Sequence, residues 1–451
     1  MLVGLTSAAV TVAIFVLAGC TASAPDPDTS AAPSAVTVPD TPVGRMTQWV
    51  LDEMNADRDT DPADWADLLH PQFLDEVSAD DVAELINRQI RPARPLVATA
   101  YRGGEREGVT TVVGDVGEPF DLTVALDDEG LITTLFLGPA ASARNAATSI
   151  DEVADRWRAL PGDVRVLVRR DDEDLIDMDT AAAGPIGSIF KLYVLAAVAD
   201  AVSAGVIAWN DTVTVTDELR SLPSGELQDA ATGTTLTVRE TALKMISISD
   251  NTATDMLMDL VGRDAVERAV VALGHHDPAL LYPFLTTREA FQLLWGVPEE
   301  MVQRWSTGDE AQRRALLEEI GALPFALEVD ELDDVPGWTE GVEWFATPAD
   351  VAAAHDGLAE RAAVDPVIAE VLGANPGVVV DAAEWPVVAF KGGSSPGALA
   401  GSWRAVGADG TVLTVVAMLS AEDPAIVTDA QSEFFALAQD VFAVEGTGPE
   451  R

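Results

Sequence analysis

A serine and a lysine three residues apart open an apolar helix in the middle of the chain. The segment Gly187-Ser-Ile-Phe-Lys-Leu-Tyr-Val-Leu195 follows a Gly-Pro break. Side chains three apart on a helix share one face, with Cβ atoms about 5–6 Å apart. A desolvated lysine at this position has a lowered pKa and can take the proton of the serine hydroxyl. Ser188 and Lys191 therefore indicate an activated nucleophile, although a serine at a helix start is on its own more commonly a cap.

A second polar motif, Ser249-Asp250-Asn251, follows the helical pattern of residues 238–247. A serine hydroxyl can relay a proton towards a leaving nitrogen, and a side-chain amide can hold a substrate carbonyl. Alone, such a triplet more commonly caps a helix or forms a turn.

A third motif, Phe390-Lys-Gly-Gly-Ser394, has the form of a strand end at which a lysine precedes two glycines. Glycines let a substrate backbone approach the strand, and the lysine offers a positive charge to a carboxylate. The whole chain has only three lysines, Lys191, Lys244 and Lys391. Chance would seldom place two of the three inside these short motifs.

In this order, SxxK, SDN and K-[TS]-G, the motifs resemble those of class A β-lactamases and penicillin-binding proteins. The spacing of Ser188 and Ser249 suits that family, and the resemblance extends from Ile150 to Val444. With the domain that precedes it, the architecture resembles the two-domain serine hydrolases encoded in clavulanic acid clusters.

The resemblance implies a role for each matching residue. Ser188 would be the acylated nucleophile, Lys191 the general base and Ser249 the proton shuttle. Substrate would be bound by Asn251, Lys391 and Ser394. The backbone N–H groups of Ser188 and Ser394 would form an oxyanion hole, in which a single donor is worth about 10²–10³ in rate.

The chain departs from the family where the acyl-enzyme is hydrolysed. Class A enzymes carry an E-x-x-L-N glutamate that positions the hydrolytic water, and no such glutamate follows the SDN motif here. The nearest text begins with Asp277, which is a candidate base, with a helix cap or loop acid as the alternative. Gly392 replaces the usual threonine and removes one hydroxyl from the carboxylate site, which Ser394 and Ser395 would partly restore. We therefore expect competent acylation and slow turnover of penicillins.

Two adjacent histidines, His275 and His276, lie beside Asp277 and have the residue types of a metal site. Side chains of adjacent residues are expected to point apart, and no further cluster is evident in the sequence. We therefore expect no metal and no cofactor.

The elements that must position these motifs lie between residues 150 and 445. Strand patterns occur at both ends, at 164–169, 174–177, 387–390, 402–406 and 412–419, and a mostly helical stretch lies between them. This order predicts one antiparallel sheet built from both ends of the domain, with a helical lobe against it. An acidic, helical insertion over 296–341 separates the SDN motif from the lysine strand, and Glu343-Trp-Phe345 after it is a candidate lining of the cleft.

A smaller domain is expected over residues 44–141. Helical patterns at 45–55 and after Ser78 precede four strand patterns, at 96–101, 108–113, 120–126 and 131–137. Helices followed by a curved antiparallel sheet resemble the cone-like folds of the steroid isomerase type. The fold class of the whole chain is therefore α+β.

The first 20 residues form an apolar run that ends in Leu17-Ala-Gly-Cys20 and resembles a lipoprotein signal peptide. Cys20 is the only cysteine, so no disulfide within the chain is possible and lipidation is the expected use of its thiol. Residues 21–43, rich in Pro, Ser, Ala and Asp, have the composition of a flexible linker. We expect an extracytoplasmic, membrane-anchored bacterial lipoprotein.

The formal net charge of −48 opposes binding to nucleic acid phosphates. The expected partners are a small β-lactam, ester or peptidoglycan-related substrate and the membrane that holds the lipid, and we expect a monomer. Two alternatives stay open. One is a carboxypeptidase like the penicillin-binding proteins, and the other is a non-catalytic cell-surface binding protein on the same scaffold.

Overall fold

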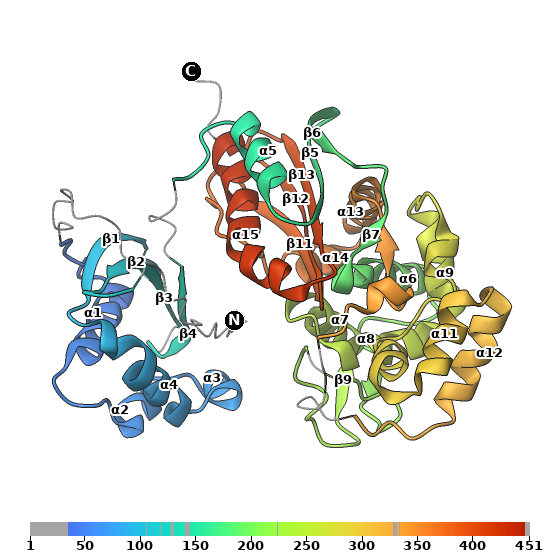
Figure 1. Ribbon diagram of the computed structural model, residues 1–451, viewed down its shortest axis with the longest axis horizontal. Helices are drawn as coiled ribbons and strands as arrows, with labels where there is room; N and C mark the ends of the chain where they lie inside the picture. The colour runs from blue at the N-terminus through green and yellow to red at the C-terminus, as the bar shows by residue number, and fades with distance from the viewer. Residues whose placement is uncertain are drawn as a thin grey trace, which may run out of the picture. The chain divides into compact units, whose positions relative to one another are not determined.

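A computed structural model describes residues 35–104, 106–117, 119–127, 130–139, 145–222, 224–327, 332 and 334–446 (Figure 1). They form two compact units that divide between Ala146 and Ala147. The predicted signal peptide with Cys20, and most of the predicted linker, lie outside the described residues. None of the described helices is long and apolar enough to cross a membrane.

The first unit places its helices before its strands, as predicted. The helices are α1 (Pro42–Asn55), α2 (Pro62–Ala66), α3 (Pro71–Glu76), α4 (Ala79–Leu85), η1 (Ile86–Ile90) and η2 (Arg91–Ala93). The antiparallel sheet has the order β1 (Val97–Gly103), β2 (Glu107–Val113), β3 (Phe120–Leu126) and β4 (Ile132–Pro139). Apolar side chains of the helices and of one sheet face form its core, among them Val50, Met54, Leu122 and Val124.

Helix α1 begins earlier than the sequence analysis proposed. The predicted linker runs to residue 43, but Thr41 already caps the helix, with its Oγ1 accepting from Gly44 N at 3.0 Å. Pro42 occupies the first turn, where its missing N–H costs nothing. The sequence Thr41-Pro42 is typical of a helix start. The prediction missed it because it directly follows a tract with the composition of a linker.

The second unit is built on the predicted five-stranded antiparallel sheet. Its order is β11 (Val387–Ser395), β12 (Ala398–Val406), β13 (Val412–Ser420), β5 (Asp163–Arg170) and β6 (Glu173–Met178). Strands from both ends of the domain therefore meet in the middle of the sheet, where β13 pairs with β5.

Helices cover both faces of this sheet (Figure 1). One face packs against α5 (Ile150–Ala159) and α15 (Pro424–Gly446), around Trp157, Trp403 and Phe434. The helical lobe lies against the other face, and its central helix is α6 (Lys191–Ser203), in which every residue from Lys191 to Ala199 is buried.

The lobe also contains many short elements. Its remaining helices are η4 (Gly187–Phe190), α7 (Val238–Ser247), α8 (Asn251–Val261), α9 (Arg263–Ala272), η5 (Pro278–Leu281), α10 (Thr287–Phe291), η6 (Gln292–Gly296), α11 (Glu299–Thr307), α12 (Glu310–Gly321), η8 (Gly337–Glu340), α13 (Pro348–Ala362) and α14 (Pro366–Leu372). Two small ladders join β7 (Gly184–Pro185) to β10 (Phe345–Ala346) and β8 (Thr212–Thr214) to β9 (Thr235–Thr237). The architecture confirms the predicted α+β fold class.

Candidate active site

Ser188 lies on the 3-10 turn η4, directly before helix α6, and Lys191 is the first residue of that helix. Gly187 adopts φ +48°, a left-handed conformation that suits glycine and turns the chain sharply into the helix. Ser188 is half-buried, and its Oγ has no hydrogen-bond partner among the described residues. Its hydroxyl is thus available to a substrate.

Lys191 is fully buried and donates three hydrogen bonds. Its Nζ lies 2.5 Å from Ser249 O, 2.7 Å from Asn251 Oδ1 and 3.0 Å from Ser249 Oγ. Lys191 and Ser249 are therefore in direct hydrogen-bond contact, an arrangement through which a proton can move between them.

Lys391 approaches the same hydroxyl from strand β11. Its Nζ lies 2.9 Å from Ser249 Oγ and 2.8 Å from Gly392 O. Both lysines are therefore within hydrogen-bond distance of one oxygen. Neither is in a salt bridge within the described residues, whereas the third lysine, Lys244, pairs with Glu226 at the surface.

The pKa values of both lysines are lowered. Burial, reinforced by the charge of Lys391, holds the pKa of Lys191 well below its ordinary value, although Asp250 and Asp255 act in the opposite direction. Burial alone lowers the pKa of Lys391 to about 7. Two buried ammonium groups that share one hydroxyl repel each other, so one charge favours the neutral form of its neighbour.

The SDN motif turns the chain between α7 and α8. Ser249 has φ +59°, an uncommon conformation for a residue with a side chain and one that is often found at functional sites. Asp250 caps α8 through Ala253 N and also accepts from the N–H groups of Glu226 and Leu227. Its buried carboxylate therefore fixes the turn that presents Ser249.

Asn251 holds Lys191 through its Oδ1 and donates from Nδ2 to Leu222 O at 3.0 Å. The residue is 6% exposed. One amide N–H is thus used inside the protein, and the substrate contact expected of Asn251 stays a prediction.

Strand β11 runs past Lys391 and does not end there, contrary to the expectation from the two glycines. Gly392, Gly393 and Ser394 all pair with β12. A methyl group on Gly393 would lie 2.0 Å from Ile186 O and 2.8 Å from Ser188 N. The glycine therefore allows β11 to pack directly on the turn that carries Ser188.

Asp277 has a structural partner in the described fold. Its Oδ1 accepts from Ala279 N at 3.3 Å and caps η5, the alternative that the sequence analysis left open. Among the described residues no carboxylate bonds to Lys191, Lys391 or Ser249.

The side chains of His275 and His276 do not point apart. The prediction that they would, on which the expectation of no metal partly rested, was wrong. The rings of His275 and His276 stack, with centroids 5.3 Å apart, and ligand atoms of both rings and of Asp350 lie within 4.8 Å of one another. Both ring nitrogens of His275 form hydrogen bonds, since Nε2 donates to Phe345 O at 3.0 Å and Nδ1 accepts from Asp277 N. Asp350 meanwhile accepts from His276 N and Thr347 Oγ1. These bonds engage both ring nitrogens of His275 and both carboxylate oxygens of Asp350, and His276 Nδ1 lies 2.7 Å from Asp350 Oδ2.

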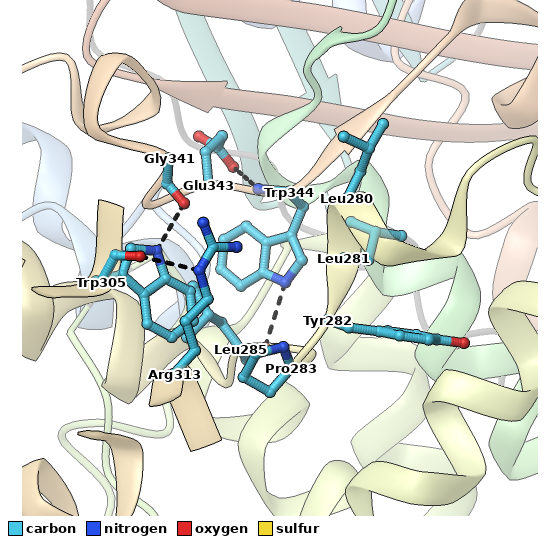
Figure 2. A pocket seen from close by; sticks show the side chains of 10 residues that line it. All are labelled: Leu280, Leu281, Tyr282, Pro283, Leu285, Trp305, Arg313, Gly341, Glu343 and Trp344. Carbon is cyan, nitrogen blue, oxygen red and sulfur yellow. Dashed lines mark hydrogen bonds between the residues drawn. The ribbon is translucent and has the colours of Figure 1, made fainter. Parts of the chain in front are cut away.

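Glu343 and Trp344, which the sequence indicated only as a candidate lining of the cleft, lie beside the Ser188 to Lys191 motif. Figure 2 shows both lining a small pocket, with Arg313 between the indoles of Trp305 and Trp344. Trp344 stacks on Phe190, inside the Ser188 to Lys191 motif, at 3.8 Å between ring centroids and 13° between planes. The only sequence signal was a glutamate directly before two aromatic residues.

The sheet, the helical lobe and the Ser188, Lys191, Ser249 and Lys391 cluster define a serine hydrolase fold of the β-lactamase type. Residues 145–370, just over half of the chain, match the family model described as "Beta-lactamase enzyme family", and the protein belongs to this family. Residues 38–132 match a second model, "ORF 12 gene product N-terminal". No curated protein matches the sequence.

Several solved structures are similar to the second unit. A β-lactamase from Sphaerobacter thermophilus is 21% identical, with a TM-score of 0.48, and the match covers 66% of this chain and 98% of that chain. A class A β-lactamase from Mycobacterium abscessus is 16% identical, with a TM-score of 0.46, over 66% and 99%. A variant of PBP-A, in an acyl-enzyme complex with penicillin G, is 15% identical, with a TM-score of 0.45, over 66% and 95%.

Proposed function

We propose that the protein is an exported, lipid-anchored serine hydrolase that forms an acyl-enzyme at Ser188 with a β-lactam, amide or ester. The observation that supports this most is the approach of Lys191 and Lys391 to one oxygen, Ser249 Oγ, at 3.0 and 2.9 Å. Two buried lysines cost folding free energy, and a site that must move protons gives a reason to keep them.

In the proposed acylation, Ser188 Oγ attacks the substrate carbonyl carbon and its proton passes to neutral Lys191. The C=O electron pair moves to oxygen, where the N–H groups of Ser188 and Ser394 bind it. The C–N or C–O bond then breaks, and Ser249 donates its proton to the leaving group while it takes one from Lys191. Lys391 supplies the positive charge that attracts a substrate carboxylate.

Release of the acyl group is proposed to be slow. The carboxylates nearest in sequence are used elsewhere, since Asp250 and Asp277 both cap helices. Water would have to attack without a carboxylate base in contact with it, and a positioned general base contributes typically 10²–10⁴-fold.

Intact-mass spectrometry tests the proposal. The protein is incubated with penicillin G or with a fluorophosphonate probe, and the expected result is one covalent adduct that persists for minutes or longer. Ser188→Ala removes the adduct, while Ser203→Ala, at the exposed end of the same helix, keeps it. Absence of an adduct on the wild-type protein, or an adduct on Ser188→Ala, would overturn the proposal.

A stem-peptide analogue separates this function from a carboxypeptidase. Catalytic release of D-alanine would assign the site to peptidoglycan in place of β-lactams or esters. The anchor has its own test, because wild-type protein expressed in a bacterium is expected to partition into detergent. Cys20→Ala is expected to stay in the aqueous phase.

A further inference from the structure

Glu343 lies close to strand β11 and to the turn η4 that carries Ser188. Its Oε2 accepts from Ser395 Oγ at 2.5 Å and its Oε1 accepts from Trp344 N at 2.8 Å. Glu343 thus ties strand β11 to its own segment, residues 342–346.

The chain around Glu343 holds the same turn from the outside. Ile186 N donates to Trp344 O at 2.9 Å, and the next two residues form β10, which pairs with β7 directly before the turn. Together with the stacking of Trp344 on Phe190, these contacts fix residues 184–190 on both sides of Ser188. Glu343 is the only member of residues 342–346 whose side chain also bonds to β11 in the described structure.

Burying the carboxyl group of Glu343 costs folding free energy. Glu343 is 6% exposed and has no salt bridge within the described residues. Arg313 lines the same pocket but donates its Nε to Trp305 O at 2.9 Å. Burial raises the pKa of Glu343 to about 7, and the hydrogen bonds from Ser395 and Trp344 offset part of this effect. An apolar side chain of similar size would fold with less cost, so stability alone does not account for a glutamate.

We infer that Glu343 is a positioning residue, which sets the distance between the Ser188 and Ser394 N–H groups by joining Ser395 of β11 to the 342–346 segment that holds Ile186. The inference rests on the proposed acylation of Ser188. It assigns to the 342–346 segment, which follows the insertion, control over transition-state stabilisation without contact to the substrate. Weakening rather than removing an oxyanion donor lowers the rate by less than the 10²–10³ of a deletion.

Three variants separate positioning from general stability. Glu343→Leu keeps the volume but leaves the buried Trp344 N–H and the Ser395 hydroxyl without this acceptor, while Glu343→Gln keeps acceptor and donor capacity. The matched control is Asp440→Leu, because Asp440 is an equally buried carboxylate, bonded to Ala147 N on the other face of the sheet. Each is assayed for acylation by a chromogenic ester under saturation, for binding of phenylboronic acid, and for its melting temperature. The boronate forms a tetrahedral adduct whose oxygen occupies the oxyanion hole.

Glu343→Leu is expected to lower the saturated acylation rate about 10–100-fold with little change in the half-saturating concentration, and to weaken boronate binding by a similar factor. Glu343→Gln should recover most of both. Asp440→Leu should lower the melting temperature and leave both unchanged. If folded Glu343→Leu acylates within about threefold of wild type, the inference is overturned and the proposed function stands. If the wild-type protein itself reacts with no probe, the proposed function is refuted and the inference falls with it.

Discussion

Gly393→Ala offers the sharpest test of how closely β11 must pack on the nucleophile turn. The added methyl group would lie 2.0 Å from Ile186 O, and Cβ atoms essentially never approach another atom within 3.0 Å. Both obstructing atoms, Ile186 O and Ser188 N, belong to the backbone, so no side-chain rotation relieves the contact. The strand and the turn must separate by about 1 Å, a misplacement that can cost about 10²-fold in rate.

The matched control is the preceding residue. A methyl group on Gly392 would meet only ring atoms of Phe390, the nearest at 2.9 Å, and a side chain can shift. We expect Gly393→Ala to lower the acylation rate constant about 10²-fold, which corresponds to about 2.7 kcal/mol of transition-state stabilisation. Gly392→Ala should stay within about threefold of wild type.

Stopped-flow acylation with a chromogenic cephalosporin or ester measures both variants, and circular dichroism verifies that each is folded. Equal rates for Gly393→Ala and Gly392→Ala would refute the reasoning, because the oxyanion N–H groups would then not depend on this contact.

Three further predictions follow from the same structure. Lys191→Met keeps the buried volume but removes the base, so the Ser188 adduct should form at least about 10³-fold more slowly by mass spectrometry; an unchanged rate would exclude Lys191 as the base. Glu343 has a pKa raised to about 7, so its stabilising effect is fully present below about pH 4.5 and is lost as the pH rises through 7. Glu343→Gln should therefore flatten the fall in unfolding free energy between these pH values by a few kcal/mol in urea titrations, and an unchanged slope would contradict the raised pKa. In the first unit, Arg91 donates to Glu53 O at 3.0 Å and to Ala56 O at 2.6 Å; Arg91→Leu should destabilise that unit by about 1–3 kcal/mol in hydrogen exchange, with acylation unchanged.

Much of the fold could be read from the sequence because its signals are local. Alternation placed β5, β13 and the strands of the first unit within a few residues of their observed bounds. The helix predicted after Ser78 begins at Ala79, and Ser78 forms a full capping box with Asp81. The short helices α2 and α3 were missed, since five or six residues are too few to show a helical period.

The site was predictable where chemistry demands particular residue types, and less so where packing decides. The scarcity of lysine drew attention to Lys191 and Lys391, which the structure brings to one hydroxyl. The place of Glu343 depends on its contact with Ser395, a residue far away in the chain, and no local pattern reports such a contact. The stacking of His275 on His276 likewise follows from tertiary contacts with Asp350.

Strand β5 precedes the helical lobe in the sequence and β13 follows it, and the two strands pair with each other. A ribosome that has synthesised Lys191 must add about 200 further residues before Lys391 exists, which takes about 10–40 s at common elongation rates. During this interval the nascent chain carries Ser188 without its oxyanion strand. Reactivity is therefore a property of the completed polypeptide, and a chain that stalls before β11 is made cannot be acylated by the route proposed here.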